Sequence, residues 1–238
     1  MTAVIEVTCF TICLSQLFTR TFCTECTDYQ LTPLPDFDDK YVNQNLVWEN
    51  QVLIGVECVG KCFFDHRCHS VQIDRNTGGC TGHATAFANH TKVYPPPTSR
   101  LGSRLYLLPR ASHYIGSGCT NDVDCHVATS VCNDGVCTCQ IGYWFSPSQK
   151  ACVTECTTLG PGLVRYAGHA IWGNDLEDLT SIEDSQCQQL CINITCSSVD
   201  YDPPGKRCFL SSATYLSVGS GSRGVHAGWV HYQRNCAS

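Results

Sequence analysis

The sequence predicts a small, disulfide-rich protein built from several modules rather than around one large core. Three observations predict this class: 20 cysteines in 238 residues, a cysteine spacing that occurs twice, and a compact set of six cysteines between the two copies. Cysteine at roughly 8% is typical of an exported protein whose thiols oxidise in pairs. Modules of under ~100 residues bury little apolar surface, so covalent cross-links must supply part of their stability.

The N-terminal residues 1–22 predict a signal peptide, because Val7 to Phe18 is mostly apolar or small and a polar stretch follows. Glu6 stands where a basic residue is typical, so an N-terminal strand or a truncated chain is the alternative. Secretion to the extracellular space is the expected localisation. Two sequons, which begin at Asn89 and Asn193, are candidate glycosylation sites.

Charge and hydropathy limit the partners of the chain. The net charge is −6, and the 15 Lys and Arg residues are scattered, with no basic run longer than Lys206-Arg207. This distribution argues against nucleic acid as a partner and disfavours heparin-like polyanions. After the N-terminal segment, no stretch approaches the roughly 20 apolar residues that a membrane span requires.

The most specific signal is a pattern of five cysteines that occurs twice. The first copy leaves 31, 3, 5 and 11 residues between its cysteines, and the second leaves 30, 3, 4 and 11. We infer that one supersecondary unit is used twice. The two sets are Cys26, Cys58, Cys62, Cys68 and Cys80, and Cys156, Cys187, Cys191, Cys196 and Cys208.

Each copy predicts one helix, because its two cysteines four positions apart lie on the same helical face. In the second copy, Ser181 and Asp184 predict a capping box at the start of that helix. The first helix is expected to be weaker, since Gly55 and Gly60 each cost roughly 1 kcal/mol relative to alanine. The apolar stripe of the second helix is expected at Ile182, Leu190 and Ile194.

Short alternating segments after each helix predict antiparallel strands, separated by Pro- and Gly-rich turns. The expected strands are Ser198 to Asp202, Arg207 to Ser211 and Gly228 to Tyr232 in the second copy, and Ser70 to Asp74 and Arg104 to Leu108 in the first.

This order of a C-x3-C helix, a nearby cysteine and a strand-borne cysteine resembles the PAN/apple family over residues 24–110 and 154–236. The resemblance implies two α+β folds, each an antiparallel sheet crossed by one helix. It also implies nested disulfides and, in the second copy, an outer bridge. In the first copy the position equivalent to Cys236 falls near Leu108 to Arg110, which hold no cysteine. The implied pairs are Cys58 with Cys80, Cys62 with Cys68, Cys187 with Cys208, Cys191 with Cys196, and Cys156 with Cys236.

The six cysteines between the copies resemble an EGF-like β-hairpin module over residues 119–153, after a linker at 111–118. The resemblance implies bonds from first to third, second to fourth and fifth to sixth cysteine. Gly116-Ser117-Gly118 precedes the first cysteine, where calcium-binding members carry acidic or amide residues, so no calcium is expected. The implied pairs are Cys119 with Cys132, Cys125 with Cys137, and Cys139 with Cys152.

Zinc is the alternative interpretation of the cysteines, and Asp65-His66-Arg67-Cys68-His69 holds ligand types. It is disfavoured because cysteines that form disulfides cannot bind zinc as thiolates. No cofactor is expected. No enzyme activity is expected either, because Gly219 to Ser222 predicts a turn rather than a strained nucleophile loop.

The eight implied pairs leave Cys9, Cys13, Cys23 and Cys26 without partners. Cys9 and Cys13 are expected to be removed with the signal peptide, so Cys23 and Cys26 remain. They can bond to each other or to another chain, so a disulfide-linked dimer through Cys26 or Cys23 is one hypothesis.

The function that these features predict is extracellular recognition or adhesion, with a protein or a glycan bound by the loops and sheets of the modules. A disulfide-linked structural matrix component is one alternative. A carbohydrate-binding lectin is another, with Trp172, Asn174 and Asp175 as its candidate cluster. For a protein partner, the candidate anchors are Trp48, Trp144, Trp172 and Trp229, of which Trp229 is expected in the core.

Overall fold

The computed structural model describes residues 31–51, 55–194 and 196–237. The predicted signal peptide, Cys23 and Cys26 lie outside the described residues. None of the helices in the described part is long and apolar enough to cross a membrane.

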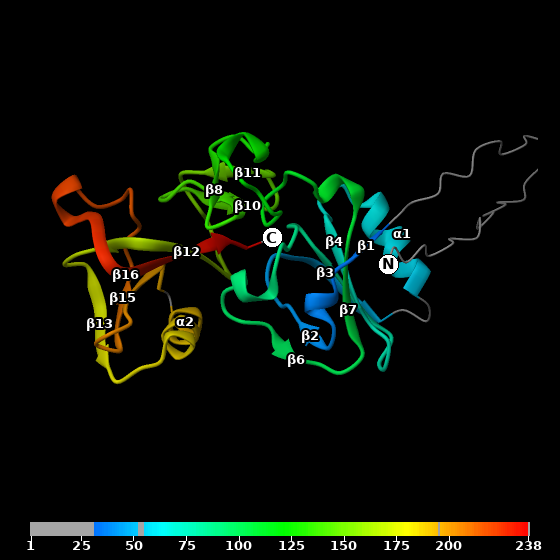
Figure 1. Cartoon of the computed structure of the whole chain (residues 1–238), viewed down its shortest axis with the longest axis horizontal. Coiled ribbons are helices and arrows are strands. Elements are labelled where there is room, and N and C mark those ends of the chain that lie inside the picture. Colours follow the sequence, from blue (N-terminus) through cyan, green and yellow to red (C-terminus); the bar gives the residue numbers. More distant parts are fainter. Residues whose placement is uncertain (1–30, 52–54, 195, 238) are drawn as a thin grey trace, which may run out of the picture.

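A five-stranded antiparallel sheet and one helix form the first module (Figure 1). The strand order is β1-β7-β4-β5-β3, and α1 (Gly55–Phe64) connects β3 to β4. A two-stranded ribbon of β2 (Lys40–Tyr41) and β6 (Thr98–Ser99) lies beside it. The sheet consists of β1 (Thr32–Pro33), β3 (Leu46–Gln51), β4 (Ser70–Asp74), β5 (Gly79–His83) and β7 (Ser103–Leu107).

The second module repeats this topology. Its strand order is β12-β16-β14-β15-β13, and α2 (Asp184–Asn193) connects β13 to β14, as α1 connects β3 to β4. The two sheets therefore share one order of strands and one helix position, which is the α+β fold that the resemblance to the PAN/apple family implies. The strands are β12 (Leu159–Ile171), β13 (Asp175–Thr180), β14 (Ser198–Asp202), β15 (Arg207–Ser211) and β16 (Arg223–Cys236).

The middle module consists of two short hairpins. β8 (Ser130–Asn133) pairs with β9 (Val136–Cys139), and β10 (Trp144–Ser146) pairs with β11 (Ala151–Val153). So small a unit has little apolar core, and three disulfides cross-link it. These are Cys119–Cys132, Cys125–Cys137 and Cys139–Cys152.

Disulfides also join each helix to its sheet. In the second module, Cys187 on α2 is bonded to Cys208 on β15, and Cys191 is bonded to Cys196 at the start of the next segment. The other pairs are Cys58–Cys80, Cys62–Cys68 and Cys156–Cys236. All eight pairs in the described residues are the ones that the family resemblances imply.

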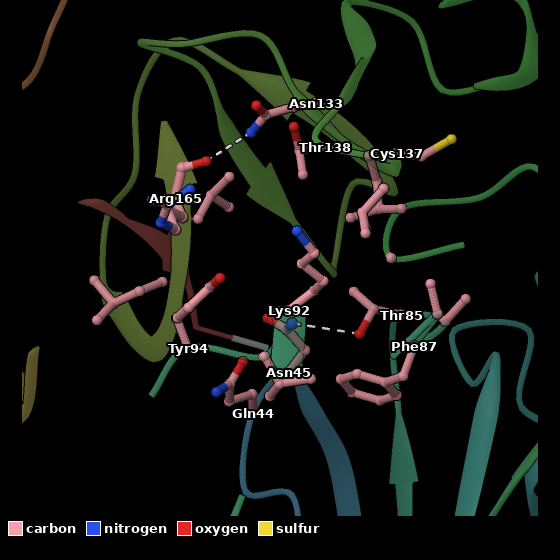
Figure 2. Close-up of a pocket in the computed structure, with 18 of the residues that line it drawn as sticks. Gln44, Asn45, Thr85, Phe87, Lys92, Tyr94, Asn133, Cys137, Thr138 and Arg165 are labelled. Atoms are coloured by element: carbon pink, nitrogen blue, oxygen red, sulfur yellow. Dashed lines mark hydrogen bonds between the residues drawn. The ribbon is translucent and has the colours of Figure 1, made fainter. Parts of the chain in front are cut away.

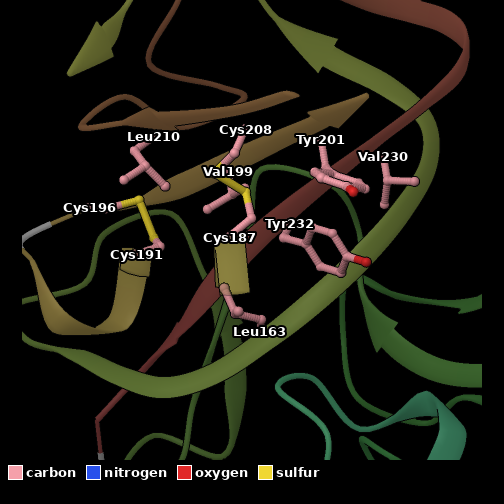
Figure 3. Packing of buried hydrophobic residues seen from close by; sticks show 10 residues of the cluster. All are labelled: Leu163, Cys187, Cys191, Cys196, Val199, Tyr201, Cys208, Leu210, Val230 and Tyr232. Atoms are coloured by element: carbon pink, nitrogen blue, oxygen red, sulfur yellow. A yellow bond between two sulfur atoms is a disulfide. The ribbon is translucent and has the colours of Figure 1, made fainter. Parts of the chain in front are cut away.

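The core of the second module lies between α2 and the sheet (Figure 3). Alternate strand residues point toward the helix, as the two-residue period of a strand requires. Val199, Tyr201, Leu210, Val230 and Tyr232 are buried in this core together with the two helical cysteines. The opposite face of the sheet is thereby left for other contacts.

The expected capping box of α2 is wrong in its residues. Ser181 has a left-handed backbone with φ of 60°, so it forms a turn before the helix. The helix is capped by Glu183, whose backbone N–H donates to Gln186 Oε1 at 3.0 Å. Asp184 instead accepts from the Tyr232 hydroxyl at 2.6 Å and so ties the helix to β16.

Candidate functional site

The outer face of the second sheet, opposite α2, is divided into a covered half and an open half. Because Val230 and Tyr232 point toward α2, the residues between and beside them, Trp229, His231 and Gln233, point outward. Phe209 lies outward on β15 for the same reason, between the core residues Cys208 and Leu210.

The middle module packs on the covered half. Gln233 Nε2 donates to the Tyr143 carbonyl at 2.9 Å, and the Gly142 N–H donates to Gln233 Oε1 at 3.1 Å. The Tyr166 hydroxyl donates to the Cys139 carbonyl at 2.8 Å, and burial raises the pKa of this hydroxyl. Beneath these contacts, His231 and Asp200 form a fully buried pair at 2.8 Å. This half of the face is occupied by the protein itself.

Four aromatic side chains lie in series on the open half, and we call them the aromatic row: Trp172, His226, Trp229 and Phe209. Successive ring centroids are 6.2, 4.9 and 5.2 Å apart. Arg207 continues the series, with its guanidinium 4.8 Å from the centroid of the Phe209 ring and an ion pair of 2.9 Å to Asp178 on β13. The series thus runs from the loop after β12 to the edge strand.

The aromatic row is accessible to a partner. The Trp172 side chain is 38% exposed, and the other three rings are half-buried. Two apolar residues of the same sheet are also exposed. They are Leu176 on β13 and Val225 on β16. Two buried polar atoms here, His226 Nδ1 and Arg207 Nε, have no hydrogen-bond partner among the described residues. Exposed aromatic residues beside unpaired polar atoms are typical of an interaction surface.

The structure places the predicted sugar-binding cluster at one end of this row. Trp172 N–H is bound to the Ser222 carbonyl at 2.8 Å, which fixes the loop. Asn174 Nδ2 donates back to the Trp172 carbonyl at 3.2 Å, so this amide serves its own loop. Asp175 is exposed at the start of β13. The pKa of its carboxyl is raised by partial burial and by the charges of Asp200 and Asp178.

The other tryptophans differ from one another in position. Trp48 is half-buried against the first core, with Lys61 Nζ 4.6 Å from its ring centroid, and Trp144 is buried. Trp229 was expected in the core, but it is half-buried on the outer face and outside the core cluster.

The sequence did not predict Phe209, His226 and Arg207 as members of this surface. The alternation of apolar residues in β16 was the available signal for Trp229.

A pocket lies where the three modules meet (Figure 2). Asp134, in the turn between β8 and β9, forms ion pairs with Lys92 of the first module and with Arg165 of the second, the latter at 3.8 Å. Asn133 Nδ2 donates to the Arg165 carbonyl at 2.6 Å. The residues around this pocket therefore join the modules to one another.

The two sequons lie in different settings. Asn89 is half-buried at the edge of the three-module pocket, and its Oδ1 accepts from the Thr91 N–H at 2.9 Å and from the Thr91 hydroxyl at 3.0 Å. Asn193 is exposed at the end of α2, where its Oδ1 accepts from Gln189 Nε2 at 3.2 Å. Thr195 lies outside the described residues.

The residues whose side chains could bind a metal ion take part in disulfides or in ring stacking instead. The sulfur atoms of Cys119, Cys125 and Cys137 lie within 4.8 Å of one another, but each belongs to a disulfide. In the Asp65 to His69 segment, Cys68 is bonded to Cys62, and the His69 ring stacks on Tyr114 at 3.7 Å. None of these sulfur atoms is a thiolate that could bind zinc.

Comparisons with known proteins identify two of the modules. The family model described as the PAN domain matches residues 162–236, which lie within the second module. The model described as the EB module matches residues 98–152, which include β7 of the first sheet as well as the middle module. No curated protein matches the chain significantly.

One solved structure with similarity to this chain contains the two N-terminal apple domains of Toxoplasma gondii microneme protein 4. The match has 10% sequence identity and a TM-score of 0.25, and it covers 84% of this chain and 89% of that chain.

Proposed function

We propose that this chain is a secreted, non-enzymatic recognition or adhesion protein that binds an extracellular protein or glycan. We propose module boundaries at 24–110, 119–153 and 154–236, with the middle module fixed between two PAN/apple folds. Eight disulfides among the described residues support an extracellular location, because cytosolic thiols are kept reduced.

The aromatic row on the open half of the second sheet is the observation that carries this proposal. Tryptophan and arginine are enriched among the residues that dominate binding energy, and here Trp172, Trp229 and Arg207 lie in one series. The sheet and two disulfides hold these side chains in place before a partner arrives, which lowers the entropic cost of binding. The covered half of the same face has no such role, because the middle module fills it.

Screening of the intact protein tests the proposed function. The chain is secreted from eukaryotic cells, its disulfides are confirmed by peptide mapping, and it is applied to arrays of glycans and of extracellular protein domains. We expect reproducible binding that Trp172→Ala weakens and that Phe64→Ala leaves unchanged. Phe64 is a suitable control because it is 80% exposed on α1, in the other PAN/apple module. Absence of binding on both arrays would contradict the proposal.

The matrix hypothesis depends on Cys23 and Cys26, which lie outside the described residues. Electrophoresis of the secreted protein with and without reductant tests it. A disulfide-linked dimer or multimer supports the structural role, and a monomer under both conditions excludes a disulfide-linked assembly.

A further inference from the structure

We propose that the outer edge of β13 binds an extended, basic segment of a partner protein by adding it to the second sheet as a further strand. This inference rests on the proposed recognition function and names the chemistry of the partner. It selects a protein over a glycan as the ligand of this surface.

The outer edge of β13 pairs with no other strand in the described residues, and the strand is regular from Glu177 to Thr180. Within residues 31–51, 55–194 and 196–237, β13 pairs with β15 alone and ends the sheet. Glu177 to Thr180 pair with Arg207 to Leu210 in unbroken register, after a bulge between Asp175 and Glu177. Five of the six residues of β13 are exposed, and Leu179 is half-buried. An edge of this kind presents unpaired N–H and C=O groups that an extended peptide can complete.

The charge of this edge defines the partner. β13 carries Asp175, Glu177 and Asp178, and among the described residues its only ion pair is that of Asp178 with Arg207. Partial burial raises the pKa of Asp175, and the charges of Asp200 and Asp178 raise it further, so a nearby cation would be stabilising. A second copy of β13 would bring carboxylates against carboxylates, whereas a lysine- or arginine-containing strand would pair with them.

The first module does not repeat this feature. Its corresponding edge strand, β3, carries a single acidic residue, Glu49, which accepts from the Tyr41 hydroxyl at 3.4 Å. The two modules share a topology but differ in the charge of this edge. The acidic edge is therefore a property of the second module and not of the fold.

The geometry of the aromatic row favours a protein over a sugar. Phe209 and Trp229 stack on each other at 27°, so each covers a face of the other, and His226 stands at 63° to Trp229. A sugar packs on an open ring face, whereas ring edges and gaps between rings accept side chains. Asp178 lies directly across from Phe209 in the register. Alternate side chains of an added strand would therefore point to the same outer face as the row.

Peptide selection on the full-length, disulfide-bonded chain tests this inference. The probe is a display library of random decapeptides, and we expect enrichment of lysine or arginine at alternating positions with apolar residues between them. A selected peptide is then synthesised, and its affinity is measured by fluorescence anisotropy. Asp175→Lys/Glu177→Lys should weaken binding at least about tenfold. Glu155→Lys, an exposed site outside β13, makes the same type of charge change and should leave the affinity within about twofold.

N-methylation of the selected peptide separates strand addition from simple charge attraction. Methyl groups on every second amide in one register should abolish binding, and methyl groups in the other register should be tolerated, because only alternate amides of an added strand face β13. Equal effects of the two registers would overturn the inference. An enriched set without basic residues, or no effect of the Asp175→Lys/Glu177→Lys variant, would also overturn it.

Glycan binding gives a distinguishable outcome. If no peptide is enriched but the glycan array is positive and Trp172→Ala abolishes the signal, the inference about β13 is wrong and the recognition function stands. If neither peptides nor arrays give binding, both proposals fail.

Discussion

Arg110 and Arg234 have the same role in the two PAN/apple folds: each guanidinium binds carbonyl groups at the C-terminal end of its helix and in the loop that follows. Burial lowers the pKa of both side chains, but five donors in a planar group allow each to bind several oxygens at once. Arg110 donates to the carbonyls of Cys62, Phe63, Asp65 and Cys68, and Arg234 donates to those of Leu159, Gly160, Cys191, Ile194 and Cys196.

We expect Arg234→Met to lower the free energy of unfolding by about 3 kcal/mol, because it leaves several buried carbonyls without a donor. Arg110→Met should have an effect of the same order. Urea unfolding with the disulfides intact measures both. Arg104→Met is the matched control. In the described part of the chain, the side chain of Arg104 makes only an exposed ion pair of 3.7 Å with Asp38, so this substitution should cost less than about 1 kcal/mol. A loss of this small size at Arg234 would contradict the assigned role.

Acid should destabilise the first module through His83. Burial lowers the pKa of this fully buried imidazole from 6.5 to about 4. In the unfolded chain the His83 imidazole is therefore protonated below about pH 6.5, whereas in the folded chain it stays neutral until the pH approaches 4. The stability present above pH 6.5 is consequently lost as the pH falls toward 4. Between pH 7 and 5, His83 should account for roughly 2 kcal/mol of lost stability. Urea unfolding at the two pH values measures this loss, and an unchanged pH dependence in His83→Gln would refute the assignment.

Gly142→Ala should loosen the contact of the middle module with the second sheet. Gly142 has a φ of +92°, and a Cβ there would lie 2.3 Å from Leu216 Cγ. Gly168→Ala is the control, because Gly168 has a φ of +73° but no atom within 4 Å of the added Cβ. We expect Gly142→Ala to cost about 1–3 kcal/mol more than the control and to speed hydrogen exchange in residues 139–143. Equal effects of the two substitutions on the free energy of unfolding would mean that the close approach of the added Cβ to Leu216 does not destabilise the protein.

Asn89 should carry an N-linked glycan in protein secreted from eukaryotic cells. The Thr91 hydroxyl donates to Asn89 Oδ1 at 3.0 Å, so the two side chains that define the sequon are adjacent in a turn. Mass spectrometry of the peptide that contains Asn89, with and without glycosidase, measures occupancy. A peptide of unmodified mass in both samples would contradict the prediction. Asn89→Gln is the control, because this variant lacks the acceptor side chain and should show no glycan mass.

The sequence predicted the local parts of the fold well, because their signals are local. Cysteines four positions apart indicated α1 and α2, and the alternating segments gave the bounds of β4, β14 and β15. β12 and β13 were not predicted: β12 has an irregular register with two shifts, and β13 is mostly polar because it is an exposed edge. Their places in the sheet depend on partners distant in the sequence.

The candidate surface was predicted only at one end, because its members meet through the sheet and not along the chain. Trp172 was singled out as a loop aromatic, and the structure gives it the most exposed ring of the aromatic row. Phe209 and Trp229 come from β15 and β16, which are separated by β14 in the sheet, so their stacking is not visible in the sequence. The outward direction of Trp229 followed from Val230 and Tyr232, once these were known to face α2.

The most direct test of the recognition surface is the affinity of the strongest ligand from the array screens for four proteins: the wild type, Trp172→Ala, Phe209→Ala and Phe64→Ala. Correct disulfides and unchanged circular dichroism establish that each variant is folded. We predict that Trp172→Ala and Phe209→Ala each weaken binding at least about tenfold, as expected for aromatic residues that anchor a contact, while Phe64→Ala matches the wild type. Wild-type affinity in both aromatic-row variants would show that the ligand binds elsewhere and would contradict the central claim.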